Sequence, residues 1–178
     1  MNNFFEHTTE IKHCGNDILT CPFLTTMAVD SIRDSCEQIA TWETNKRLEY
    51  FTHDIHFKVV LPTLYEILTE YLEEEIFPLA MEFWNIDEFK VSDLFAIKYS
   101  SDTQTSLGIH HDNSFVSGSV KLNDNYSGAK LHFPRQNWNN KTIPVGHLIL
   151  WPGNITHQHC CTELEEGEKH SLTIWSKQ

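Results

Sequence analysis

Apolar residues recur at helical spacing through much of the first half of the chain. In residues 24–42 they fall every three or four positions, which predicts the apolar face of a helix: Leu24, Ala28, Ile32, Cys36 and Ile39. Because proline suits the first turn of a helix, a second helix is expected from Pro62, with an apolar repeat that continues until Pro78 interrupts it. The short stretch 11–23 could supply a strand.

The second half consists of short segments rich in β-branched and aromatic residues, separated by Gly, Pro, Asn and Asp. Five of them are predicted to be strands: residues 91–100, 114–122, 128–133, 147–151 and 170–175. Their spacing is typical of an antiparallel sandwich or jelly roll, with the helices packed against one sheet. Because no repeat or linker divides the chain, we expect one α+β domain. About 1–90 would be its helical support region and about 91–178 its jelly-roll core.

Composition and charge narrow the function classes. With 178 residues, 40% hydrophobic and 21% charged, the chain has the make-up of a globular protein that can bury a core without disulfides. Its net charge of −12 argues against a nucleic-acid partner, because phosphates would be repelled, and favours a basic polypeptide or a small molecule. Five cysteines at irregular spacing are expected to be mostly free thiols.

No targeting or membrane segment is evident in the sequence. The N-terminus lacks a basic region followed by an apolar one, and no apolar run approaches the roughly 18 residues of a membrane span. We therefore expect a cytoplasmic chain that does not bind a membrane, unless it was cut from a longer exported protein.

Coordinating side chains gather at the start of one predicted strand, in "LGIHHDNSFVSGSVKLN". Residues i and i+2 of a strand face the same side, so His110 and Asp112 can converge while His111 points away. One imidazole and one carboxylate make half of a metal site. A third ligand must come from elsewhere in the chain.

The other dense cluster of coordinating groups is "NITHQHCC", which follows the predicted strand "HLILW" and could return beside the first cluster. It offers His157 and His159 as ligands. The spacing to Lys169 favours His159, and His157 remains a possible substitute. Two imidazoles and one carboxylate leave one side of a metal open, which is the facial arrangement of non-haem Fe(II) oxygenases.

A keto-acid co-substrate such as 2-oxoglutarate would chelate the iron, and its distal carboxylate would need a cation deeper in the barrel. Lys169 stands ten residues after His159 at the start of the last predicted strand, where Ser171 and Thr173 share its face. An ammonium with a hydroxyl beside it can bind a carboxylate. Tyr99 could add a phenol donor to the same carboxylate.

Three segments resemble a known family: "THDIHF", "IKYSSDTQTSLGIHHDNS…LN" and "PVGHLILWPGNITHQHC…GEKHSLTIW". Together they are similar to the Fe(II)/2-oxoglutarate-dependent dioxygenases, specifically the catalytic domain of the procollagen lysyl hydroxylases, with the prolyl 4-hydroxylases next. The resemblance covers roughly residues 50 to 175. It implies a double-stranded β-helix, the cupin-like jelly roll, as the core.

The resemblance also implies a site and a reaction. The implied iron ligands and catalytic residues are His110, Asp112 and His159, and the implied 2-oxoglutarate contacts are Tyr99, Lys169 and Ser171. The implied cofactors are Fe(II) and 2-oxoglutarate, with ascorbate as an optional addition. The implied reaction uses O2 to hydroxylate an aliphatic C–H of a lysyl or prolyl residue in a polypeptide, releasing succinate and CO2. A homodimer is also implied.

Two departures keep other functions open. Lysyl hydroxylases commonly carry Arg where Lys169 stands, whereas collagen prolyl 4-hydroxylases have Lys, and the segment after "YSG" lacks the arginine-tyrosine-aspartate sequence associated with the lysyl substrate. One alternative is a dioxygenase for a free amino acid or another small molecule. A second is a non-catalytic β-roll in which Cys160 and Cys161 join the histidines in a closed zinc site. Trp151, Phe133 and Trp175 are expected to form apolar walls.

Overall fold

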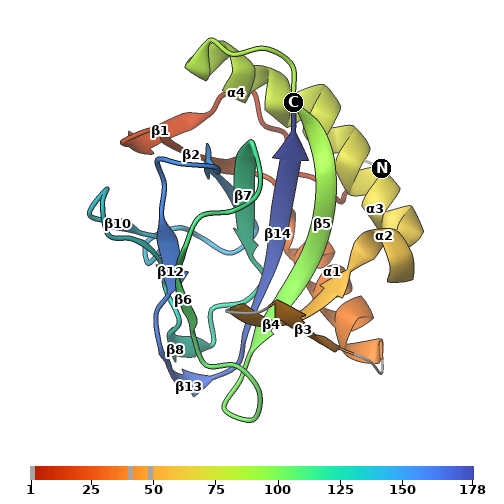
Figure 1. Ribbon diagram of the computed structural model, residues 1–178. Helices are drawn as coiled ribbons and strands as arrows, with labels where there is room; N and C mark the ends of the chain where they lie inside the picture. Colours follow the sequence, from red (N-terminus) through yellow and green to blue (C-terminus); the bar gives the residue numbers. More distant parts are fainter. Residues whose placement is uncertain (1–2, 40–41, 48–49) are drawn as a thin grey trace.

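The computed structural model describes residues 3–39, 42–47 and 50–178. An eight-stranded antiparallel sheet is the larger of two facing layers (Figure 1). Its strands in spatial order are β1 (Lys12–Gly15), β2 (Ile18–Pro22), β11 (His147–Pro152), β7 (Val116–Lys121), β14 (Lys169–Lys177), β5 (Lys90–Tyr99), β4 (Tyr50–His56) and β3 (Glu43–Arg47).

The smaller layer is a four-stranded antiparallel sheet. Its strands in spatial order are β10 (Trp138–Asn139), β9 (Leu131–Phe133), β12 (His159–Cys161) and β6 (Leu107–His110). A separate ladder joins β13 (Leu164–Gly167) to β8 (Tyr126–Gly128). The two facing sheets form the predicted jelly roll.

Helices cover the face of the larger sheet that is turned away from the smaller one (Figure 1). They are α1 (Thr26–Gln38), α2 (Phe57–Val60), α3 (Pro62–Tyr71), the π-helical segment η1 (Leu72–Ile76) and α4 (Phe77–Trp84). The predicted apolar face of α1 is buried against the sheet, and the Thr25 hydroxyl caps this helix by accepting the Ala28 N–H at 3.2 Å. None of the helices in the described part of the chain has the length and apolar character needed to cross a bilayer.

The helical path does not end at Pro78, contrary to the expectation from the sequence. The π-helical turn of η1 shifts the hydrogen-bond register, and a new helix, α4, starts at Phe77. Pro78 therefore lies in the first turn of α4, where its missing N–H leaves no bond unmade.

Several strands differ from those predicted. The stretch 11–23 forms two strands, β1 and β2, because Asn16 and Asp17 turn the chain with φ values of 51° and 61°. Residues 128–133 are likewise divided into β8 and β9 by Ala129, whose φ is 41°. The described part of 1–90 supplies four strands as well as helices, and these strands extend both edges of the larger sheet.

Candidate metal centre and co-substrate cavity

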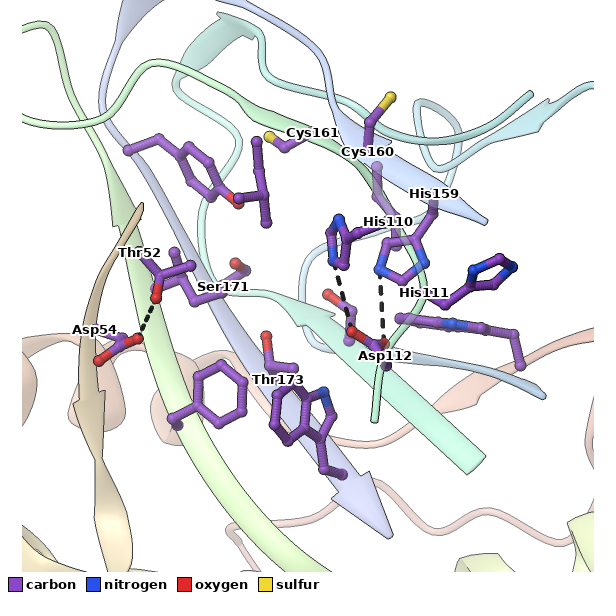
Figure 2. Close-up of a pocket in the computed structure, with 18 of the residues that line it drawn as sticks. Thr52, Asp54, His110, His111, Asp112, His159, Cys160, Cys161, Ser171 and Thr173 are labelled. Atoms are coloured by element: carbon purple, nitrogen blue, oxygen red, sulfur yellow. Dashed lines mark hydrogen bonds and ion pairs between the residues drawn. The ribbon is translucent and has the colours of Figure 1, made fainter. Parts of the chain in front are cut away.

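Two short strands of the smaller sheet bring two histidines together. His110 is the last residue of β6 and His159 the first of β12, and the antiparallel pairing of these strands sets the two residues opposite each other. Their ring centroids are 4.4 Å apart. Strand alternation was expected to place Asp112 beside His110, but β6 ends at His110, and the segment after it turns the carboxylate toward both rings. The ring of His111 points away from the other two histidine rings and from Asp112 (Figure 2).

Ligand atoms of His110, Asp112 and His159 all lie within 4.8 Å of one another. Asp112 Oδ1 is 3.5 Å from His110 Nε2, and Asp112 Oδ2 is 3.6 Å from His159 Nε2 (Figure 2). Each Nδ1 donates to a backbone carbonyl: His110 to Gly108 O at 2.8 Å, and His159 to His157 O at 3.0 Å. These bonds fix the ring orientations and turn both Nε2 atoms inward, as is common for metal-binding histidines.

Burial and charge at this triad fit a divalent cation. Burial alone would raise the pKa of Asp112, but a hydrogen bond from His110 and the nearby His159 ring lower it, so that the carboxylate stays ionised. Burial lowers the pKa of His159 and favours the neutral, ligating imidazole. Among the described residues no hydrogen-bond partner reaches Asp112 Oδ2. A buried carboxylate oxygen in this state is available to a metal ion.

A cavity of about 200 Å³ opens beside the triad, between the two sheets. The larger sheet contributes polar side chains to it from the cavity side of β14, namely those of Lys169, Ser171 and Thr173. These three are the residues that the sequence placed on one face of the last strand. Ser171 and Thr173 face the triad across the cavity (Figure 2).

Lys169 and Tyr99 form the closed end of this cavity. They lie opposite each other on β14 and β5, and the Lys169 ammonium is 4.8 Å from the centre of the Tyr99 ring. Both are buried, with exposed fractions of 4% and 3%. Lys169 Nζ donates to Ala129 O at 2.9 Å and contacts Cys161 Sγ at 3.4 Å. Within the described part of the chain no carboxylate forms an ion pair with it.

This end of the cavity fits the distal carboxylate of 2-oxoglutarate. A buried ammonium without a counter-charge is costly, and an anionic ligand would remove that cost. Burial also raises the pKa of Tyr99 well above its ordinary value, so its phenol stays protonated and can donate.

Comparisons with known proteins agree with this geometry. Procollagen-lysine,2-oxoglutarate 5-dioxygenase 1 of Gallus gallus is 26% identical over 157 residues, which cover 80% of this chain and 21% of that protein. A Pseudomonas putida prolyl-4-hydroxylase has a TM-score of 0.68 at 17% identity, over 91% of this chain and 92% of that one. The viral collagen prolyl hydroxylase of Paramecium Bursaria Chlorella virus-1, in its 2OG complex, has a TM-score of 0.64 at 14% identity, over 91% and 96%.

The chain is thus similar in sequence to procollagen-lysine 2-oxoglutarate dioxygenases and similar in fold to prolyl hydroxylases. The resemblance stated from the sequence motifs is thus confirmed, together with the jelly-roll fold. No family model matches the chain. It spans about a fifth of the length of the curated relatives it matches.

The two alternatives for the metal site find no support in the geometry of the described residues. His157 is 3% exposed, and both of its ring nitrogens are engaged, Nδ1 with Thr156 Oγ1 at 2.8 Å and Nε2 with Asn16 O at 2.6 Å. Among the described residues, His110, Asp112 and His159 are the one group of three or more side chains whose metal-ligand atoms lie close together. Cys160 and Cys161 are not part of this group. A closed zinc site would need them. All five cysteines are free, as predicted.

Apolar walls border the triad, as the aromatic residues of the sequence suggested. Trp151 and Trp175 line the cavity, and the centre of the Phe133 ring lies 5.3 Å from that of the His159 ring. Sequence reasoning missed Thr52 and Asp54, which also line the cavity, from β4. The alternation of polar residues in "THDIH" was the signal that could have indicated them.

Proposed function

We propose that this chain is an Fe(II)- and 2-oxoglutarate-dependent dioxygenase that hydroxylates an aliphatic C–H of a lysyl or prolyl residue in a polypeptide. The observation that carries the proposal is the convergence of His110, Asp112 and His159 on one side of a cavity whose closed end holds Lys169. Three protein ligands on one face leave coordination positions for a chelating keto acid and for O2.

Each of these groups has a definite part in the proposed reaction. His110, Asp112 and His159 would hold Fe(II), and Lys169 and Tyr99 would hold the distal carboxylate of 2-oxoglutarate, which orients its keto acid toward the metal. When bound, Fe(II) and 2-oxoglutarate supply the oxidising power, with O2 as oxidant and succinate and CO2 as products. The protein's own contribution is to position the substrate C–H bond and to exclude water.

In the proposed reaction, two tryptophan rings that border the cavity would exclude water. Trp151, on β11 of the larger sheet, is buried, with its ring centre 5.1 Å from that of His159. Trp175, on β14 of the same sheet, also lines the cavity. A dry cavity strengthens the electrostatic contacts within it and protects a reactive site from side reactions.

A polypeptide substrate is supported by the similar proteins, which include a procollagen-lysine dioxygenase and collagen and other prolyl hydroxylases. The net charge of −12 supports a basic rather than an acidic chain.

The first test is anaerobic addition of Fe(II) and 2-oxoglutarate, for which we expect the visible absorption of the metal–keto-acid chelate. The second is aerobic succinate release, with and without ascorbate, in the presence of collagen-like peptides that contain Lys or Pro, followed by mass spectrometry for one added oxygen atom. Absence of the chelate band in a folded chain would overturn the proposal. Stimulation by free lysine or proline alone would replace the polypeptide with an amino-acid substrate.

A further inference from the structure

A serine hydroxyl that has no part in the site described so far is buried in the centre of the larger sheet. Ser117 lies on β7, directly opposite Trp151 of β11 and Trp175 of β14. Opposed residues of an antiparallel pair face the same side of a sheet. Because both tryptophans line the cavity, Ser117 also points to the cavity side. It is 0% exposed, and its hydroxyl has no hydrogen-bond partner among the described residues.

This hydroxyl lies close to Asp112, one of the three proposed metal ligands. The Trp151 ring, next to Ser117 in the ladder, has its centre 5.1 Å from that of His159. His159 Nε2 in turn is 3.6 Å from Asp112 Oδ2. Burial alone would raise the pKa of Asp112, and Ser117 is one of the groups that lower it, after His110 and His159. The serine and the carboxylate therefore occupy the same corner of the site.

The two groups are complementary, and each lacks a partner. Asp112 Oδ2 is a buried acceptor, and Ser117 Oγ carries a buried donor, with no hydrogen bond to either among the described residues. A buried polar group without a hydrogen bond is costly. A carboxylate that gives one oxygen to a metal ion keeps the other as an acceptor, and a hydroxyl can rotate about a single bond to reach it.

Packing alone does not account for a hydroxyl at this position. The side chain between Trp151 and Trp175 must be small, and alanine would meet that requirement without burying a polar atom. The backbone of Gly153 also covers the hydroxyl, because a Cβ at Gly153 would lie 2.8 Å from Ser117 Oγ. A donor that is enclosed in this way serves a neighbouring protein group rather than bulk water.

We propose that Ser117 is a positioning residue for Asp112, whose hydroxyl donates to the carboxylate oxygen that the metal leaves free and so holds Asp112 as a one-oxygen ligand. This inference rests on the proposed function, because it takes Asp112 as a metal ligand. A carboxylate that bound through both oxygens would occupy one of the positions that the keto acid and O2 need. Ser117 would thus keep the metal open, although it does not touch the metal itself.

Ser117→Ala tests the assignment, because it removes only the hydroxyl. Co(II) is titrated into the folded variant and followed by its visible absorption. We expect the Co(II) affinity to fall about tenfold, as for the loss of an outer partner of a ligand. The absorption bands should also change, because the carboxylate is then able to bind through both oxygens. The Tm of the metal-free variant should be unchanged or higher, since a buried hydroxyl without a partner is lost.

The matched control is Ser119→Ala. Ser119 lies two residues further along β7, on the same face and opposite Thr173, and it lines the cavity. This variant loses the same atom and should keep both the Co(II) affinity and the absorption bands of the unmodified chain.

Unchanged Co(II) affinity and bands in folded Ser117→Ala would overturn the proposal, and so would equal losses in the two variants. A lower Tm with unchanged bands would make Ser117 a residue of the fold alone. Failure of the folded, unmodified chain to bind Co(II) is a different result, because it contradicts the proposed metal site itself. Normal Co(II) binding that Ser117→Ala leaves intact contradicts only the role of Ser117.

Discussion

Substitution of His157 by phenylalanine tests how the proposed iron ligand His159 is held. The His157 ring joins the segment before β12 to the turn between β1 and β2, through its bond to Asn16 O at 2.6 Å. The backbone carbonyl of His157 in turn accepts the His159 Nδ1–H. Phenylalanine keeps the ring and its edge contact with Phe133, whose centre is 6.0 Å away, but removes both ring nitrogens.

The expected magnitude follows from the bonds that are lost. Two hydrogen bonds of His157, to Asn16 and Thr156, contribute about 1 kcal/mol each to stability, so unfolding should become about 2 kcal/mol easier. For a domain of this size that corresponds to a fall in Tm of about 4–8 °C. The variant keeps the His157 carbonyl that accepts the His159 Nδ1–H but loosens the segment that carries it, so metal binding should weaken by up to about tenfold, the lower end of the effect of losing an outer partner altogether.

Titration with Co(II), followed by its visible absorption, measures the metal affinity of folded protein, and circular dichroism gives Tm. His132→Phe is the matched control, because His132 makes one bond of the same kind, to Trp138 O at 3.1 Å, in the same sheet. It should lose stability but keep its metal affinity. Unchanged Co(II) affinity in His157→Phe would refute the reasoning, and a loss as complete as in His159→Phe would make His157 itself a ligand.

Three other substitutions and one chemical probe test separate parts of the molecule. Asp112→Ala should abolish succinate formation while the circular dichroism spectrum stays native, because only the proposed ligand is removed. Lys169→Met should raise the KM for 2-oxoglutarate about tenfold to a hundredfold in the succinate assay, since the methylene stem remains and the charge is lost. Gly118→Val should destabilise the chain by about 1–3 kcal/mol in urea unfolding, because even a Cβ at this position would lie 3.0 Å from a Leu150 methyl group. Burial raises the pKa of Cys36 to about 12, so at pH 8 only roughly one in ten thousand Cys36 thiols is ionised. Iodoacetamide should therefore modify Cys36 far more slowly than the less buried Cys160. Equal rates of modification in folded protein would contradict this.

The triad could be predicted because the residue types and their spacing along the chain indicate a metal site. His110 and Asp112 stand two positions apart, and the distance from His159 to Lys169 singled out the second histidine. The geometry that joins them was less accessible. β6 and β12 contain four and three residues, too few for a period of two to be recognised. The turn that brings Asp112 back toward the His110 and His159 rings has no hydrophobic pattern in the sequence from which it could be predicted.

Asp54 escaped prediction for a different physical reason. A strand is recognised by the contrast between an apolar and a polar face, but Ile55 is the single apolar residue in "THDIH", and His53 stands at the other position of its face. The alternation is therefore present but weak in the part of the strand that lines the cavity. The π-helical turn η1 could not be predicted either, because a shift of hydrogen-bond register does not alter the apolar repeat from which the helix was predicted.

The distribution of the site over two sheets separates its tasks. The smaller sheet presents His110 and His159, whereas the larger sheet presents Lys169 and Asp54. Substitution of Lys169 in β14 should therefore change affinity for the co-substrate while Co(II) binding stays as it was. The bond from His157 to the β1–β2 turn is an exception, because it ties the ligand-bearing segment of the smaller sheet to an edge of the larger one. Disturbance of that turn should consequently reach the metal, although no residue of it lies among the ligands.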